Sequence, residues 1–432
     1  MLEIDCLSIN NLGHLCIGGC DTVELSEQYG TPLYVMHEES IRNACRQYKQ
    51  SINKYYDGHG LPLYASKALN CLEICRIMQD EGLGLDVVSQ GELFTALKSG
   101  FNPSFIHFHG NNKTHEELNM AIENNVGIIV VDNLEELNNL NKIAKEKNKK
   151  INISLRIKPG VEAHTHEFIK TGQIDSKFGF GIENDEAMNV IRLCLNMSNI
   201  SLKEVHCHIG SQIFELEPFI LASKIMMDFI AKIRDEFSYS IDSLNLGGGF
   251  GIKYTESDKP ICVDECIRQV SNVIKEKAKE HNIKIPFIYV EPGRSIVGPY
   301  GITLYRVGSV KNIKNVRTYV SVDGGMTDNP RYPLYRSEYT VLAANKAGDP
   351  KDMLVTIAGK CCESGDLIQE NVMIQKVKAQ DILAVLSTGA YNYSMASNYN
   401  RILKPPIVMI KDNVPRIIVT RQSYEDIIKN DI

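Results

Sequence analysis

The stretch EVHCHIGS (204–211), followed by PFILASKIMMDFIAKIRDEF (218–237) and LNLGGGF (244–250), determines the fold class predicted for this chain. It reads as an apolar strand, an amphipathic helix and a second apolar strand. Strands that alternate with helices in this way are parallel and are joined by right-handed crossovers. The stretch therefore predicts one repeat of an α/β fold.

The same alternation extends over residues 62–295. The predicted strands are PLYASKA (62–68), GLDVVS (84–89), FIHFHGN (105–111), IIVVDN (128–133), ISLRIKP (153–159), EVHCHIGS (204–211), LNLGGGF (244–250) and IYVEPGRS (288–295). Helical patterns separate all of them, and the amphipathic segment 40–56 supplies a further helix ahead of the first strand. Such a series, over about 250 residues, fits a closed (β/α)8 TIM-like barrel better than an open doubly wound sheet.

After residue 295 the pattern changes to short alternating strands separated by Gly, Pro and Asp-Asn turns. Examples are ITLYRVGSVKNI (302–313), RTYVSVDGG (317–325) and DILAVLSTG (381–389). This pattern is typical of an antiparallel β domain, either a barrel or a sandwich. Strand-like pieces also occur in residues 1–32, so we expect a barrel domain at 33–295 and a β domain formed by 1–32 and 296–432.

Composition and charge exclude several classes of protein. The 432 residues are 43% hydrophobic and 23% charged, which is enough apolar sequence for a sizeable core and excludes a disordered chain. A net charge of −6 argues against nucleic acid or an anionic membrane as the main partner. We see neither a membrane-spanning run nor a secretory signal, and the twelve cysteines suit a reduced compartment, so we expect a cytoplasmic protein.

Polar residues gather at the predicted strand ends, where (β/α)8 barrels carry their active groups. They are Lys67, Asp86, His109, Asp132, Arg156, His208, Gly247–Gly249, Glu291 and Arg294. Exposure to solvent in surface loops explains some of these residues singly, but it explains the set poorly. The sequence therefore predicts a ligand site at this end of the barrel.

Three features of this set point to pyridoxal phosphate as the cofactor. Lys67 ends an apolar strand, where burial would lower the pKa of a lysine and let it form a Schiff base with an aldehyde. The glycine run LGGGFG (246–251) and Gly293 of EPGR follow the last two strands, where barrels commonly bind phosphate. Glu291 is the candidate acidic partner for the pyridine nitrogen.

A metal-dependent hydrolase is the main alternative to this interpretation. Its support is the three H-x-H pairs His107 with His109, His164 with His166, and His206 with His208, because such pairs share one face of a strand. A metal site leaves Lys67 and the glycine run without a role. We therefore predict no metal and expect the imidazole of His208 to stack on a pyridine ring.

The residues above belong to a longer series of motifs. The series is YASKALN (64–70), LDVVSQGEL (85–93), HGNNK (109–113), SKFGFG (176–181), HCHIGSQ (206–212), GGGFG (247–251), EPGR (291–294), DGGMTDNPRYPLY (323–335), CCESGD (361–366), GAYNYSMASNYN (389–400) and RQSYEDI (421–427). In order and spacing it resembles the fold type III pyridoxal-phosphate-dependent decarboxylases over nearly the whole chain. The resemblance is strongest to the branch that converts meso-2,6-diaminopimelate to L-lysine and CO2, the last step of lysine biosynthesis.

The resemblance implies roles for individual residues. For catalysis it implies Lys67, Cys362 and His208, with Lys67 bound covalently to the cofactor and Cys362 as the proton donor. For cofactor binding it implies Lys67, Asp86, His208, Ser211, Gly248, Gly249, Glu291, Gly293, Arg294 and Tyr391. For substrate binding it implies Arg294, Arg331, Tyr335, Glu363 and Tyr391. It also implies a homodimer with active sites at the subunit interface, since the family's C-E-S-G-D segment reaches the neighbouring subunit.

Several alternatives remain open on the sequence alone. On the same fold, the enzyme could decarboxylate ornithine, lysine, arginine or carboxynorspermidine, although the segment from Arg331 to Tyr335 and Glu363 argue against the basic amino acids. A non-catalytic homologue would be expected to have lost Lys67, Cys362 or Glu291. The extra Cys361 is expected to have a packing role, and the polar segment 163–175 is a hypothetical loop that closes over the site.

Overall fold

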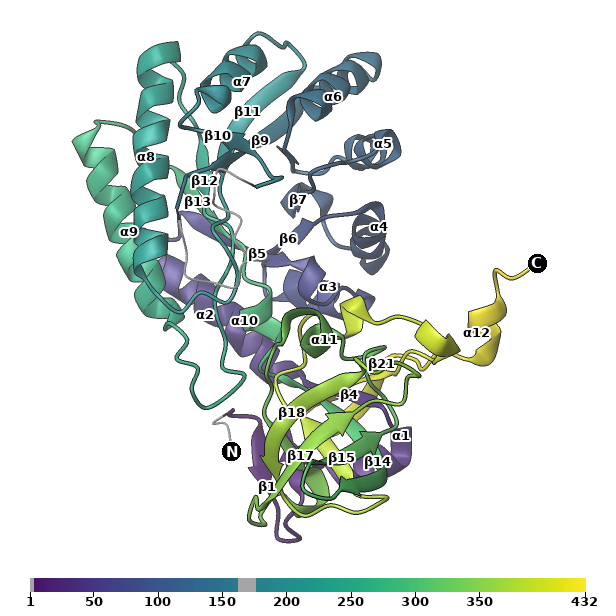
Figure 1. Cartoon of the computed structure of the whole chain (residues 1–432). Helices are drawn as coiled ribbons and strands as arrows, with labels where there is room; N and C mark the ends of the chain where they lie inside the picture. The colour runs from purple at the N-terminus through teal and green to yellow at the C-terminus, as the bar shows by residue number, and fades with distance from the viewer. Residues whose placement is uncertain (1–3, 162–175) are drawn as a thin grey trace. The chain divides into compact units, whose positions relative to one another are not determined.

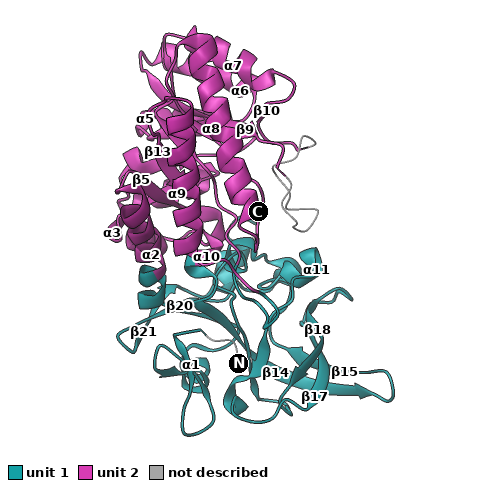
Figure 2. Cartoon of the chain, turned by 90° about the vertical axis from the view of Figure 1, so that its left-hand side faces the viewer, with its two compact units in different colours: residues 1–43, 252–258, 296–432 teal, residues 44–251, 259–295 magenta. Residues whose placement is uncertain are grey.

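The computed structural model describes residues 4–161 and 176–432. The chain forms two compact units, which Figure 2 shows in different colours. Unit 1 consists of residues 1–43, 252–258 and 296–432, and unit 2 consists of residues 44–251 and 259–295. The segment 163–175, which we expected to form a loop over the site, lies outside the described residues.

Unit 2 contains a closed barrel of eight parallel strands (Figure 1). The strands are β5 (Gly60–Ala65), β6 (Gly84–Val87), β7 (Ile106–Phe108), β8 (Ile128–Val131), β9 (Ile151–Lys158), β11 (Ile200–His206), β12 (Ser243–Asn245) and β13 (Phe287–Val290). Pairing runs from β9 through β11, β12, β13, β5, β6, β7 and β8 back to β9, and β10 (Phe180–Gly181) adds a short extension beside β9. The predicted (β/α)8 barrel is thus confirmed.

Helices surround these strands in Figure 1. They are α2 (Glu38–Tyr56), α3 (Leu72–Asp80), α4 (Gln90–Ser99), α5 (His115–Glu123), α6 (Leu134–Glu146), α7 (Glu186–Leu195), α8 (Glu217–Phe237) and α9 (Val263–Glu280). Helix α9 shows why they pack here, because its buried residues Cys266, Val270 and Ile274 recur every four positions and form one apolar stripe. Among the described residues, none of the helices is both long and apolar enough to cross a bilayer.

Unit 1 is built on a mainly antiparallel sheet of short strands. The strands are β4 (Leu33–His37), β14 (Gly301–Ile313), β15 (Arg317–Val322), β16 (Val341–Ala343), β17 (Met353–Ala358), β18 (Leu367–Ile374), β19 (Ile382–Val385), β20 (Ile407–Lys411) and β21 (Val414–Val419). The sheet order is β18-β17-β15-β14-β4-β20-β21, with β19 paired to β14 and β16. The predicted β domain is present, but the pairs β15–β17 and β4–β20 are parallel, so the sheet is not purely antiparallel.

The remaining elements of unit 1 are short. They are β1 (Leu7–Ile9), β2 (Leu15–Ile17), β3 (Cys20–Asp21), α1 (Thr22–Tyr29), α10 (Arg294–Val297), α11 (Arg331–Tyr335) and α12 (Tyr424–Ile428), with α10 beginning in unit 2. β1, β2 and β3 form a small antiparallel sheet of their own. A buried apolar cluster that includes Leu15, Leu33 and Val408 joins the N-terminal and C-terminal parts of the chain.

The division of the chain differs from the expected boundaries in two places. Strand β4, which we placed with the barrel at 33–295, pairs with β14 and β20 of unit 1, and residues 252–258 also belong to unit 1. The position of β4 was difficult to predict because its sequence, LYVMH, is an apolar run that is almost fully buried. An apolar run of this kind is equally consistent with a barrel strand and with a central strand of a β domain.

A buried ion pair fixes the loop that follows β7. Lys113 Nζ lies 2.8 Å from Glu136 Oε1 of α6, and both side chains are almost completely buried. The same ammonium donates to the carbonyl oxygens of Gly110 (2.7 Å) and Val130 (2.8 Å). The pair therefore ties the loop at 109–113, which carries His109 at the barrel rim, to its neighbouring strand and helix.

We expect Lys113→Met to lower the free energy of unfolding by about 3–5 kcal/mol, because the Glu136 charge then stays buried without its partner. Replacing Glu136 by Leu as well removes that charge, so the double variant should lose less stability than the single one. Urea unfolding followed by circular dichroism measures both, with Lys142→Met on the exposed face of α6 as the control. Equal losses in the single and double variants would contradict the expectation.

Candidate active site

A cavity of about 350 Å³ lies at the C-terminal ends of the barrel strands in unit 2. Its lining residues are Lys67, Asp86, Val88, His109, Gly110, Asn111, Arg156, Phe178, His206, His208 and Glu291. Most of them stand at the end of a barrel strand or in the loop just after it. The structure thus gathers most of the polar residues that the sequence analysis assigned to the strand ends into one concave site.

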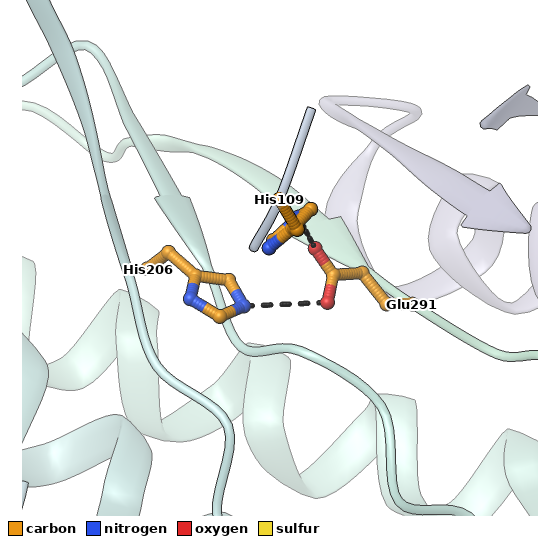
Figure 3. A group of neighbouring side chains, drawn as sticks. All are labelled: His109, His206 and Glu291. Atoms are coloured by element: carbon orange, nitrogen blue, oxygen red, sulfur yellow. Dashed lines mark hydrogen bonds and ion pairs between the residues drawn. The ribbon is translucent and has the colours of Figure 1, made fainter. Parts of the chain in front are cut away.

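Glu291, directly after β13, is the centre of the polar contacts in this cavity. Its Oε1 lies 2.9 Å from His109 Nε2 and accepts a hydrogen bond of 2.8 Å from Asn245 Nδ2. Its Oε2 lies 3.3 Å from His206 Nε2. Figure 3 shows His109 and His206 beside the Glu291 carboxylate, each joined by a dashed line to a different oxygen. Two strands, β11 and β12, and the loop after β7 therefore converge on this side chain.

The two histidines keep this buried carboxyl group ionised. Burial alone would raise the pKa of Glu291, but the neighbouring His109 and His206 hold that pKa well below its usual range. Burial would likewise lower the pKa of His109, yet Asp86 and Glu291 raise it above its ordinary value. Glu291 and His109 therefore form a charged pair, in which the imidazolium compensates the buried negative charge.

His206 and His208 have the opposite character, since burial makes both imidazoles neutral. Burial lowers the pKa of His206 to about 4, against the effect of Glu291. It lowers the pKa of His208 well below the ordinary value, with Lys67 adding to the effect. His208 Nδ1 accepts a hydrogen bond of 3.2 Å from the backbone N–H of Gly248, so the proton of the neutral ring lies on Nε2.

A second acid lies deeper in the barrel. Glu204 of β11 is fully buried, with its Oε1 3.6 Å from Nδ1 of the buried His107. Burial raises the pKa of Glu204 to about 8 and lowers the pKa of His107 to about 3. Both groups are therefore neutral near pH 7, and the layer below the ionised Glu291 carries no charge.

The glycine turn after β12 is packed too closely for any side chain. A Cβ on Gly248 would lie 2.2 Å from the carbonyl oxygen of Glu291. Gly249 has φ +106°, and a Cβ there would lie 2.6 Å from the carbonyl oxygen of Gly210. Nearby, Arg294 Nη2 donates to Ser211 Oγ at 2.8 Å. Backbone amides, a guanidinium and a hydroxyl are thus brought to the loops after β11, β12 and β13, as an anion site requires.

These groups fit pyridoxal phosphate. Lys67 lies in the short turn after β5 and, unlike our expectation of an apolar environment, its side chain is exposed and lines the cavity. It shares that cavity with the neutral His208 and the ionised Glu291, which suit a pyridine ring and its protonated nitrogen. The cavity also contains residue types that bind metal ions. The possible ligand atoms of His109, His206 and Glu291 lie within 4.8 Å of one another.

Unit 1 brings together three of the residues expected to bind substrate. The guanidinium of Arg331, the first residue of α11, lies 5.1 Å from the ring centre of Tyr335 and 5.1 Å from that of Tyr391. Tyr391 has φ +70°, a left-handed conformation that costs a non-glycine residue about 1–3 kcal/mol. Strain of this kind is concentrated at functional sites and could not be read from the sequence.

The segment that carries Cys362 and Glu363 is fixed by one buried carboxylate. Asp366 accepts hydrogen bonds from the backbone N–H groups of Met326 (2.6 Å) and Cys361 (2.7 Å). Cys361 is buried, and burial raises the pKa of its thiol to about 12, whereas Cys362 and Glu363 are exposed. Asp366 therefore ties the turn at 361–366 to the loop that leads into α11.

Two of the residues that shape the site were not predicted from the sequence. Asn245 and Glu204 were not singled out, and His109 and Arg156 were noted at strand ends without a role. A signal was available for Asn245, which stands between the apolar Leu244 and Leu246, whereas Glu204 lies in a strand with several other polar residues and had none. Arg156 Nε lies 3.9 Å from Asp132 Oδ1, and its guanidinium carbon lies 4.3 Å from the ring centre of Phe178. The contact with Phe178 has no signature in the sequence.

Comparison with known proteins agrees with this geometry. The family model "Pyridoxal-dependent decarboxylase, pyridoxal binding domain" matches residues 38–298. Diaminopimelate decarboxylase of Bacillus subtilis (strain 168) is 48% identical over 426 residues, covering 98% of this chain and 96% of its own length. That of Staphylococcus aureus (strain COL) is 45% identical over 423 residues, 98% of each chain. The crystal structure of diaminopimelate decarboxylase from M. jannaschii in complex with L-lysine superposes with a TM-score of 0.93 at 36% identity, covering 100% of this chain and 99% of that one.

Because the pKa of Glu204 is raised in the folded protein, we expect the free energy of unfolding to depend on pH. Between about pH 4.5 and pH 8 the folded protein keeps a proton on Glu204 that the unfolded chain has lost, so its contribution to stability falls as the pH rises, by about 1.4 kcal/mol per pH unit. Glu204→Gln removes this titration. Urea unfolding at pH 5, 6, 7 and 8 should show the wild type losing stability relative to the variant. Parallel pH curves for the two proteins would contradict a neutral Glu204.

Proposed function

The chain belongs to the pyridoxal-dependent decarboxylases, and we propose that it removes one carboxyl group from meso-2,6-diaminopimelate to give L-lysine and CO2, the last step of lysine biosynthesis. The observation that carries the proposal is the barrel cavity, in which the exposed Lys67 faces the same space as the ionised Glu291. The named substrate is supported by relatives that share 45–48% identity over nearly the whole chain.

Pyridoxal phosphate, when bound, supplies an electron sink for the pair of electrons that is released as the bond from Cα to the carboxylate breaks. We assign its binding to Lys67, Asp86, His208, Ser211, Gly248, Gly249, Glu291, Gly293, Arg294 and Tyr391. Lys67 would bind its aldehyde group, and His208 would lie against its ring. The ionised Glu291 would pair with the protonated pyridine nitrogen, and the glycine turn with Arg294 would hold the phosphate.

Substrate selection is assigned to Arg294, Arg331, Tyr335, Glu363 and Tyr391. Diaminopimelate carries an amino group and a carboxylate at its distal end, and in this proposal Glu363 takes the ammonium while an arginine takes the carboxylate. Ornithine and lysine lack the distal carboxylate, so they would leave an arginine unpaired at a cost of a few kcal/mol. This difference favours diaminopimelate over the basic amino acids.

The remaining assignment concerns the proton that replaces CO2 on Cα. Cys362 is exposed, and we assign to its thiol the donation of this proton, with the segment 361–366 reaching into the site of a neighbouring subunit. In this proposal the active enzyme is a homodimer with active sites at the subunit interface. All twelve cysteines are free of disulfides, which suits an enzyme of the reducing cytoplasm.

The substrate is tested by offering purified protein with pyridoxal phosphate meso-diaminopimelate, L-ornithine and L-lysine in parallel. We expect CO2 and L-lysine from diaminopimelate and at least about 100-fold lower kcat/KM for the other two, because a missing buried charge partner costs a few kcal/mol. Quantified CO2 and amine products give the answer, and Lys67→Ala should abolish turnover. Preferred turnover of ornithine or lysine would contradict the assignment of Arg331 and Glu363.

The shared active site is tested by mixing two inactive variants, Lys67→Ala and Cys362→Ala. If each site takes Lys67 from one subunit and Cys362 from the other, a reassociated equal mixture should recover about a quarter of the wild-type activity, because half of the dimers are mixed and each has one intact site. Cys361→Ala is the matched control and should stay active. A mixture as inactive as its components would contradict sites shared between subunits.

A further inference from the structure

Asn245, the last residue of β12, links two parts of the cavity without lining it. The side chain is completely buried. Its Nδ2 donates to Glu291 Oε1 at 2.8 Å, and its Oδ1 accepts from the backbone N–H of Gly247 at 2.9 Å. One amide therefore contacts both the central carboxylate and the first residue of the glycine turn.

The orientation of this amide is determined by its partners. The backbone N–H of Gly247 can only donate, so it must face Oδ1, which leaves the Nδ2 donor for the carboxylate of Glu291. The backbone around it is equally fixed, since Cys207 N–H donates to the Asn245 carbonyl (2.8 Å) and Glu291 N–H donates to that of Gly247 (2.7 Å). Loops after β11, β12 and β13 are thus joined around one side chain.

Asn245 differs chemically from the other two partners of Glu291. His109 and His206 can gain or lose a proton, whereas an amide donates its hydrogen bond unchanged at any ordinary pH. An ionised aspartate in its place would have the same shape and would still accept from Gly247, but it could not donate to Glu291 and would repel its carboxylate. The two hydrogen bonds of Asn245 can therefore be separated by substitution.

We propose that Asn245 is a positioning residue that holds the Glu291 carboxylate and the glycine turn 247–249 in one fixed arrangement for the cofactor. It acts through Glu291 and Gly247 and not by touching the substrate. This inference rests on the proposed function in one respect, because it takes Glu291 and the glycine turn as the groups that bind the pyridine nitrogen and the phosphate. A residue needed only for folding would affect stability without distinguishing these two groups.

The first test compares Asn245→Asp with Asn245→Ala. Asn245→Asp keeps the bond to Gly247, so the dissociation constant of pyridoxal phosphate, titrated into the apoenzyme, should change by less than about threefold while kcat falls about 10- to 100-fold. Asn245→Ala loses both bonds, so cofactor affinity should fall about tenfold as well. Asn152→Asp, which adds the same charge at an exposed position of β9, is the control and should behave as wild type.

The second test asks whether Asn245 acts through Glu291. In the Glu291→Gln background there is no ionised carboxylate to hold, so adding Asn245→Asp should change kcat by less than about threefold, a clear departure from additivity. An equal effect of Asn245→Asp in both backgrounds would overturn the proposal. So would an unchanged kcat in the single variant, or parallel losses of cofactor affinity and melting temperature in both Asn245 variants.

Cofactor titration also separates this inference from the proposed function. If the wild type binds pyridoxal phosphate but does not decarboxylate diaminopimelate, the substrate assignment fails, while the contrast in cofactor affinity between Asn245→Asp and Asn245→Ala still decides the role of Asn245. Should Asn245→Ala not fold, Asn245→Ser removes most of the amide at smaller loss of volume and polarity. Melting temperatures of the apoenzymes show whether each variant is folded.

Discussion

A carboxylate that stays ionised inside a barrel needs neighbours that stabilise its buried negative charge, and the contacts of Glu291 provide them. Burial disfavours the charged form of any acid, so Glu291 needs a nearby cation and hydrogen-bond donors. The structure supplies an imidazolium from His109, a neutral imidazole from His206 and an amide from Asn245, all within 3.3 Å of its oxygens. Each of these three comes from a different strand or strand end, so the closed barrel is needed to bring them together.

Strand register explains why these groups meet at one level. In neighbouring strands Arg156 of β9 pairs with His206 of β11, which pairs with Asn245 of β12, which in turn pairs with Tyr289 of β13. In a parallel sheet, paired positions lie on the same face, so those that face the interior of the barrel come near one another. Glu291 stands just beyond these positions, and the neutral pair of Glu204 and His107 lies deeper in the barrel.

The sequence predicted those features that depend on local patterns. The alternation of apolar strands with amphipathic helices identified all eight barrel strands, and the charged strand ends located the cavity. Features that depend on distant contacts were not predictable. The position of β4 in the sheet of unit 1 depends on pairing with β20, far along the chain, and the exposure of Lys67 depends on the shape of the finished cavity. The link from Asn245 to Glu291 likewise joins residues that share no sequence motif.

Residue types alone do not distinguish a metal site from a buried carboxylate that two histidines stabilise, as the group of His109, His206 and Glu291 shows. A zinc ligand must be a neutral imidazole with a free lone pair directed at the ion. In this cavity Asp86 and Glu291 raise the pKa of His109, which favours the imidazolium, a form with no lone pair to offer. Its Nε2 lies 2.9 Å from Glu291 Oε1. As an imidazolium, His109 compensates the negative charge of Glu291 beside the cavity that Lys67 shares.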